Sequence, residues 1–207
     1  MSAQADIIAT ESPKRRQILD AAGQLFLKDG YAAVSMDALA RLAGVSKATL
    51  YAYFPGKDAL FGAMVAERCA GMLAQDRLIS DHDAPLAEAM RRLIDFWLRF
   101  LISPDVVSTY RTVLAEGARF PDLARAFFEA GPVMGLGWVG EWIAEEQRRG
   151  RLRPDFDPRV AAPQFIALLR GELYIKIALG LVAEPSEEAV AAEVDAATDT
   201  LLRAFAV

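Results

Sequence analysis

The sequence predicts an all-α protein of nine or ten helices. Apolar residues recur at helical spacing along almost the whole chain, and no segment alternates between apolar and polar residues as a half-buried strand would. Capping residues, glycines and prolines divide the chain into pieces of helical length. The 207 residues are enough for a small domain followed by a larger one.

The first part of the chain contains clear signals for helix starts and ends. Residues 1–12 are expected to form a flexible tail. Ser12 followed by Pro13 predicts a helix start, because serine caps helices and proline is favoured at the first helical position. Glycine suits the residue after a helix, and proline pushes the preceding residue out of helical geometry. These rules predict helices over 13–29, 35–43, 46–54 and about 57–80.

The second part of the chain is predicted to form longer helices separated by polar or proline-containing breaks. One of them contains Gly131 and Pro132, which should kink or divide it. The helices are predicted over about 86–102, 105–117, 121–150, 158–181 and 186–205.

One cysteine and one histidine limit the chemistry that the chain can perform. Cys69 cannot form an intrachain disulfide, which fits a reducing compartment, and we expect it to be buried. His82 lies in the polar break SDHDAP and is expected in an exposed loop. These residues predict no metal site and no bound cofactor. No stretch resembles a signal peptide or a membrane span, so we expect a cytoplasmic protein with no membrane partner.

The net charge of −5 is distributed unevenly. Residues 1–60 contain seven Lys and Arg against six Asp and Glu, whereas the remainder contains 16 against 22, which gives +1 and −6. A local basic face is sufficient for binding a polyanion. The asymmetry therefore places any anionic partner at the N-terminal end.

Residues 35–54 contain two short helices joined at Gly44. Two helices that meet at a steep angle form the unit that places a recognition helix in the DNA major groove. With Leu50 directed inward, a step of about 100° per residue puts Ala48 and Ala52 on the opposite face. This small-residue face predicts close approach to another surface.

Polar side chains border that face. Thr49 and Tyr53 flank it on one side and Tyr51 on the other, and hydroxyl groups suit a surface lined with phosphate oxygens. Ser46 lies at the helix N-terminus, whose N–H groups and positive dipole end favour an anion. Lys57, at the start of the next helix, is predicted to add a charge-assisted phosphate contact.

The run ALARLAGVSKATLYAYFPGKDALF resembles the DNA-binding signature of the TetR family of bacterial transcriptional regulators, with an AcrR-like helix-turn-helix. The segment LFLKDGY is similar to the end of the first helix in that family. The resemblance is close over residues 14–61 and extends to the rest of the chain only in architecture.

The resemblance implies a role for individual residues. Phosphate contacts are expected from Ser35, Thr49, Tyr53 and Lys57, and base or groove contacts from Lys47, Ala48 and Tyr51. Ala52 stands where relatives often have an aromatic residue, and it offers at most a methyl contact. The expected DNA-binding residues are Ser35, Ser46, Lys47, Ala48, Thr49, Tyr51, Tyr53 and Lys57.

The resemblance also implies a DNA-binding domain over residues 13–58 and a ligand-binding and dimerisation domain over 59–207. Large apolar residues are concentrated over 86–142, where an apolar cavity is plausible. The last two helices are rich in apolar residues and alanine, and we expect them to form a homodimer interface. The expected pocket residues are Phe96, Trp97, Phe100, Tyr110, Phe127, Met134, Trp138, Arg170 and Tyr174.

Three functions are consistent with these patterns. The favoured one is a homodimeric repressor that leaves its double-stranded operator DNA when a small, largely apolar effector binds. The second is a DNA-binding regulator without a small ligand that acts through a protein partner. An all-α enzyme is least favoured, since the sequence has no glycine-rich phosphate loop and no catalytic set around its single histidine.

Overall fold

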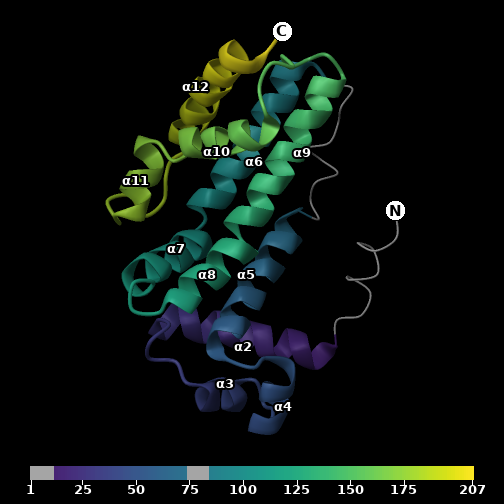
Figure 1. The fold of residues 1–207 in the computed structure, drawn as a ribbon. Coiled ribbons are helices and arrows are strands. Elements are labelled where there is room, and N and C mark those ends of the chain that lie inside the picture. Colours follow the sequence, from purple (N-terminus) through teal and green to yellow (C-terminus); the bar gives the residue numbers. More distant parts are fainter. Residues whose placement is uncertain (1–11, 74–83) are drawn as a thin grey trace. The chain divides into compact units, whose positions relative to one another are not determined.

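The computed structural model describes residues 12–73 and 84–207 (Figure 1). Helices account for all the regular structure in these ranges, apart from an isolated antiparallel bridge between Leu152 and Ala206. The predicted all-α fold is therefore confirmed. The tail predicted before Ser12, the loop containing His82 and the last turns of the helix predicted over 57–80 lie outside the described residues.

The chain divides into two compact units. The first comprises residues 1–68 and 112–130, and the second comprises residues 69–111 and 131–207. The boundary predicted after residue 58 separates DNA binding from ligand binding and dimerisation. This predicted boundary concerns function, whereas the two units are defined by their compactness, so the boundary stays a prediction.

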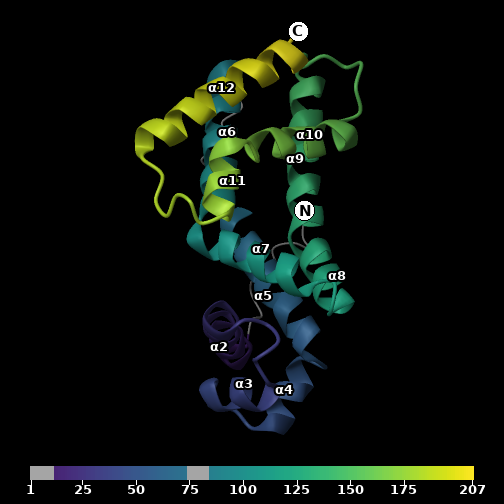
Figure 2. The same cartoon turned by 90° about the vertical axis from the view of Figure 1, so that its left-hand side faces the viewer.

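The first unit is built around the N-terminal helices (Figure 2). Its core contains an aromatic group in which the rings of Tyr31 and Phe61 lie 5.6 and 5.3 Å from that of Phe26. Ile18, Leu39, Leu50 and Leu60 complete the core, with no exposed surface. The helices that contribute to it are α2 (Pro13–Asp29), α3 (Met36–Leu42), α4 (Lys47–Tyr53), α5 (Lys57–Leu73), the end of α7 (Pro104–Glu116) and α8 (Pro121–Ala130).

Among the serines at the starts of α2, α3 and α4, two cap their helices. The hydroxyl oxygens of Ser35 and Ser46 accept hydrogen bonds from the backbone N–H of the third residue beyond them, at 3.2 and 3.0 Å. Ser12 lies at the predicted start of α2, but its side chain makes no cap. The Ser12 hydroxyl instead lies 2.9 Å from the hydroxyl of Tyr53 on α4, a partner 41 residues away.

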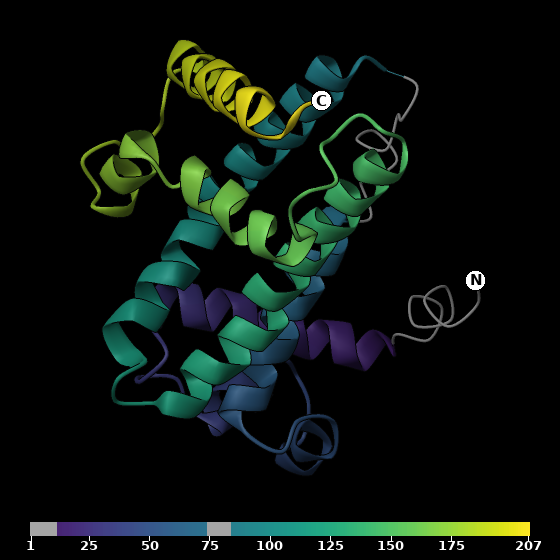
Figure 3. The ribbon, with the colours of Figure 1, turned by 45° about the horizontal axis from the view of Figure 1, so that its top comes forward.

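The second unit is a helical bundle (Figure 3). Helix α6 packs against α12, and α9 packs against α10. Leu93, Ile94, Leu98, Val139 and Phe165 are almost completely buried between them. The helices are α6 (Leu86–Ile102), the first part of α7, α9 (Pro132–Arg148), α10 (Pro158–Leu169), α11 (Glu172–Ala178) and α12 (Glu187–Phe205).

The single helix predicted over 158–181 is wrong. The structure breaks it between α10 and α11, where Arg170 has φ −92° and ψ 38° and Gly171 has ψ −158°. Glycine costs a helix about 1 kcal/mol relative to alanine. A Cβ at position 171 would also lie 2.7 Å from Glu193 Oε1 of α12, so the chain comes close to α12 at the break. Apolar periodicity continues through the break, which is why the sequence pattern did not reveal it.

Among the residues described, no helix combines the length and apolar character needed to cross a bilayer.

Candidate nucleic-acid interface

The turn between α3 and α4 depends on Gly44. Its φ of 62° lies in the left-handed region, which a residue with a Cβ rarely adopts. The turn is closed by a hydrogen bond of 3.0 Å from the Val45 N–H to the Ala40 carbonyl. Leu50 is completely buried, so it fixes which side of α4 faces outward.

The outward side of α4 carries most of the predicted DNA-binding residues. Tyr51 and Tyr53 keep 45% and 37% of their surface exposed. Thr49 is half-buried, and its hydroxyl lies 2.8 Å from that of Ser46. The structure brings the following residues together as exposed groups on or beside α4: Ser46, Lys47, Ala48, Tyr51, Ala52 and Tyr53.

An ion pair that the sequence did not indicate joins α3 to α4. Lys47 Nζ lies 2.8 Å from Asp37 Oδ1, and both side chains are exposed by about 60%. The hydrogen bond to Asp37 and the attraction of its carboxylate raise the pKa of Lys47. The lysine predicted to contact bases is therefore paired with an acidic residue of α3. Asp37 stands in the first turn of α3, where an acidic residue is explained by the helix dipole alone.

Lys57 occupies a different position from the one expected of a phosphate ligand. Its Nζ donates hydrogen bonds to the carbonyl oxygens of Tyr31 and Val34, at 2.6 and 2.9 Å. It also lies 4.2 Å from the centre of the Tyr31 ring, in a cation–π contact. Burial lowers the pKa of this ammonium group, and the nearby Glu116 carboxylate partly opposes that effect. These contacts hold the Lys57 ammonium group against its own unit, and its phosphate contact stays a prediction.

Tyr53 is linked to the start of α2. Its hydroxyl lies 2.9 Å from that of Ser12, and the guanidinium carbon of Arg15 lies 5.7 Å from the centre of the neighbouring Phe54 ring. These contacts hold the end of α4 against the first turn of α2. A phosphate that approached Tyr53 would therefore meet a hydroxyl that is already positioned.

The predicted pocket residues fall into separate groups. Four aromatic residues of α6 and α9 form one group, in which the rings of Phe96, Phe100 and Trp138 lie 6.1, 5.8 and 6.0 Å from that of Trp97. Phe127 belongs to the first compact unit, so the structure does not place it in this group. Met134 lies on α9 and is 38% exposed.

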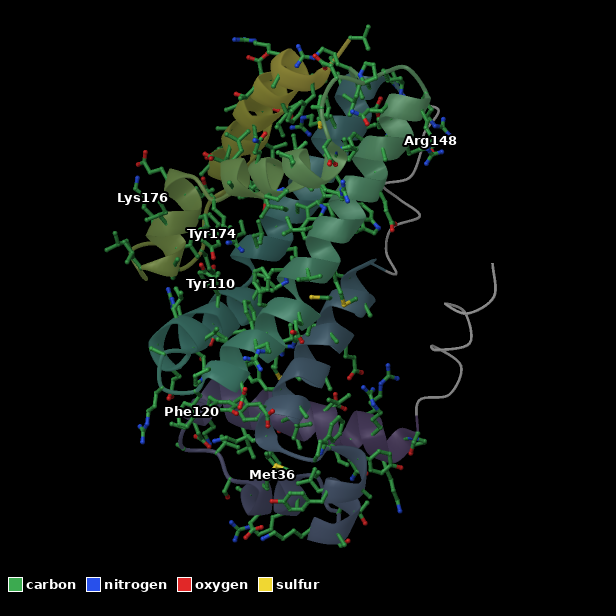
Figure 4. The ribbon with its side chains drawn as sticks, viewed as in Figure 1. Met36, Tyr110, Phe120, Arg148, Tyr174 and Lys176 are labelled. Atoms are coloured by element: carbon green, nitrogen blue, oxygen red, sulfur yellow. The ribbon has the colours of Figure 1, made fainter. Side chains whose placement is uncertain are left out.

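The remaining three predicted pocket residues form what we call the Arg170 cluster: Tyr110, Arg170 and Tyr174. The guanidinium carbon of Arg170 lies 5.2 Å from the centre of the Tyr110 ring and 5.7 Å from that of Tyr174. The two rings are 6.3 Å apart. Figure 4 labels both tyrosines, which come from α7 and α11.

The fold and the exposed side of α4 define a class of protein, namely a helix-turn-helix transcriptional regulator with a larger helical domain. Comparisons with known families identify it more closely. A family model described as "Bacterial regulatory proteins, tetR family" matches residues 18–64, and one described as "AefR-like transcriptional repressor, C-terminal domain" matches residues 88–207. The chain belongs to the TetR family of bacterial transcriptional regulators.

Individual relatives agree with this assignment. The chain is 40% identical to a solved structure named "Flavonoid-responsive Regulator FrrA", with a TM-score of 0.77 over 93% of this chain and 97% of that one. A TetR-family regulator from Mesorhizobium loti is 26% identical, with a TM-score of 0.79 over 95% of this chain and all of that one. The regulator UidR of Escherichia coli K12 is 25% identical over 174 residues, which is 81% of this chain and 84% of UidR.

Proposed function

We propose that the protein is a homodimeric repressor that binds double-stranded operator DNA through α4 and leaves it when a small aromatic effector binds. The observation that carries this proposal is the exposed side of α4. Two tyrosines and a lysine there surround Ala48 and Ala52, whose short side chains leave space for the floor of a major groove.

The contacts that we propose follow from the positions of the side chains. Lys47 and Tyr51 are exposed on the outward side of α4 and would reach base edges. Thr49 and Tyr53 would contact phosphates, together with Ser35 at the N-terminus of α3. Lys57 is left out of this set because its ammonium group is bonded to carbonyls of its own unit.

The proposed effector class draws on one relative and one feature of the chain. The relative that is 40% identical carries a name describing it as flavonoid-responsive. In this chain, the second unit contains an aromatic group around Trp97, of the kind that stacks on planar rings. We therefore propose a planar aromatic effector.

The proposed dimer forms through the last part of the chain. Large apolar side chains that remain exposed there are candidates for burial against a second copy, as homodimer interfaces are more apolar than the rest of a protein surface. The exposed residues of this kind within 158–181 are Val160, Ile175, Leu179 and Leu181, with exposures between 52% and 72%.

The experiment is a selection of genomic fragments by the purified protein, followed by affinity measurements at several salt concentrations. A dimer predicts a recovered motif with two inverted half-sites about 34 Å, or one helical turn, apart. Lys47→Ala and Tyr51→Ala should each recover an altered motif, whereas Lys28→Ala, an exposed lysine in the last turn of α2, should recover the original one.

The outcomes separate the alternatives. If Lys47→Ala and Tyr51→Ala both recover the wild-type motif, direct base reading by these residues is wrong. If wild-type protein binds its operator but no aromatic compound releases it, a regulator that acts through a protein partner is favoured.

A further inference from the structure

Arg170 is a charged side chain with an unusual set of contacts. It is half-buried at the end of α10, and in the described part of the chain it forms no ion pair with a carboxylate. Its Nε atom is buried and has no hydrogen-bond partner among the residues described. A buried donor without a partner costs about 1–3 kcal/mol, and more when the group is charged.

In two other arginines of the same unit, the Nε atom has a hydrogen-bond acceptor. Arg151 donates from Nε to Oε2 of the completely buried Glu146 at 2.5 Å, and from Nη1 to the Ala84 carbonyl at 2.7 Å. Arg111 donates from Nε to the Ala178 carbonyl at 2.7 Å. Arg170 differs from both, because its guanidinium lies over aromatic rings. These rings attract the positive charge, but they do not accept a hydrogen bond from the Nε–H group, which points within the guanidinium plane.

Tyr174, which contacts the Arg170 guanidinium, does not supply a negative charge. The burial of Tyr174 raises the pKa of its hydroxyl, and this effect outweighs the opposite influence of Arg170. The hydroxyl therefore stays neutral at physiological pH and cannot act as a phenolate partner of the guanidinium. An anionic partner from outside the chain would supply that charge.

We infer that Arg170 binds the acidic oxygen of the aromatic effector, with Tyr110 and Tyr174 against the effector's ring system. This inference rests on the proposed function and names the chemistry of the ligand: an aromatic compound with an ionisable hydroxyl or carboxyl group on its ring. A planar guanidinium with several N–H groups matches an oxyanion and stacks on aromatic surfaces, which an ammonium group does less well.

The surroundings of the cluster fit such a ligand. Tyr174 belongs to the apolar core that also contains Trp97 and Leu169, and Tyr110 and Phe100 pack against the same core. An aromatic ring system would thus find apolar and aromatic neighbours next to one localised positive charge. The break between α10 and α11 creates this arrangement, because a continuous helix would give residue 170 a helical backbone and a different side-chain direction.

The test compares two ligands on four proteins. The ligands are apigenin, a flavone with three free hydroxyl groups, and its fully O-methylated analogue, which keeps the ring system but has no acidic oxygen. The proteins are the wild type, Arg170→Gln, Arg170→Lys and the matched control Arg159→Gln, which changes an exposed arginine on the same helix. Affinity is measured by calorimetry on the full chain, and each ligand-free variant is checked for its melting temperature.

Wild-type protein and Arg159→Gln should bind apigenin roughly tenfold to a hundredfold more tightly than the methylated analogue, as expected for a hydrogen bond to a charged group. Arg170→Gln should bind the two ligands with nearly equal affinity, and Arg170→Lys should recover only part of the preference. The comparison between ligands on the wild type stays informative even if a variant folds poorly.

Two results would overturn the inference. One is a preference for apigenin in Arg170→Gln equal to that of the wild type. The other is failure of the wild type to bind either apigenin or an aryl carboxylate such as naphthoate. The proposed function fails separately, because operator binding by the wild-type protein is measured without any ligand.

Discussion

Replacing Lys57 with methionine distinguishes a structural lysine from a phosphate ligand. Methionine keeps most of the length and apolar volume of the stem but removes the ammonium group. The change leaves the carbonyls of Tyr31 and Val34 without their donor, and it removes the cation–π contact with the Tyr31 ring.

The size of the effect follows from these contacts. A hydrogen bond from a charged donor contributes about 1.5–3 kcal/mol, and a partly desolvated cation–π contact adds roughly 1 kcal/mol. The total is reduced by the desolvation of the ammonium group, which is also the main cause of its lowered pKa. We therefore expect Lys57→Met to lower the free energy of unfolding of the first unit by about 2–4 kcal/mol.

Hydrogen exchange followed by mass spectrometry measures this loss locally. Peptides covering residues 26–42 should exchange faster in Lys57→Met, whereas peptides from α6 provide an internal comparison. DNA affinity is then measured against salt at a temperature where both proteins are folded. The matched control is Lys14→Met, which removes an exposed lysine at the start of α2 and should leave exchange in 26–42 unchanged.

The opposite pattern would refute this account of Lys57. A phosphate ligand predicts a salt slope that falls by about one unit in Lys57→Met, with wild-type protection of residues 26–42. A structural lysine predicts faster exchange and an unchanged slope. Observing the first pattern would restore the role that the sequence suggested.

Two further predictions concern the cores of the two units. Burial raises the pKa of Tyr31 to about 12, so the unfolded chain loses the hydroxyl proton at a lower pH than the folded chain does. The free energy of unfolding should therefore fall as the pH rises from about 10 to about 12. In alkaline denaturation, Tyr31→Phe should lose less stability over that range. In α9, a Cβ at Gly135 would lie 2.8 Å from Cη2 of the buried Trp97, whereas one at Gly137 would meet no atom within 4 Å. Gly135→Ala should therefore destabilise the protein by about 1–3 kcal/mol, and Gly137→Ala should be neutral or stabilising, as measured by urea denaturation followed by tryptophan fluorescence. Equal effects at the two glycines would contradict the close packing against Trp97.

The sequence predicted features that depend on neighbouring residues. Caps, glycines and prolines located the ends of most helices, and the buried Leu50 correctly indicated the outward side of α4. The same rules did not locate the break at Arg170, because the apolar pattern continues through it and the close approach of Gly171 to α12 depends on tertiary packing.

The hydrogen-bond partners of Lys57 could not be predicted from the sequence for a similar reason. Its partners are backbone carbonyls 23 and 26 residues away, and no side-chain pattern marks a carbonyl as an acceptor. The pair of Asp37 and Lys47 also depends on how α3 and α4 pack together. Local propensity predicts elements well, whereas the partner of a long charged side chain is decided by the tertiary fold.

The pair of Asp37 and Lys47 has a consequence for how the protein searches a chromosome. Moving the Lys47 ammonium group to DNA separates it from a carboxylate, which is then left beside the polyanion. Each encounter that uses Lys47 thus exchanges one ionic partner for another, so the gain in free energy is small unless a base edge accepts its hydrogen bonds well. If Lys47 reads bases as proposed, we expect it to remain with Asp37 on unrelated sequences, from which the protein should dissociate readily. We expect the pair to lower affinity for random DNA more than affinity for the operator, so that residence time increases at the correct site.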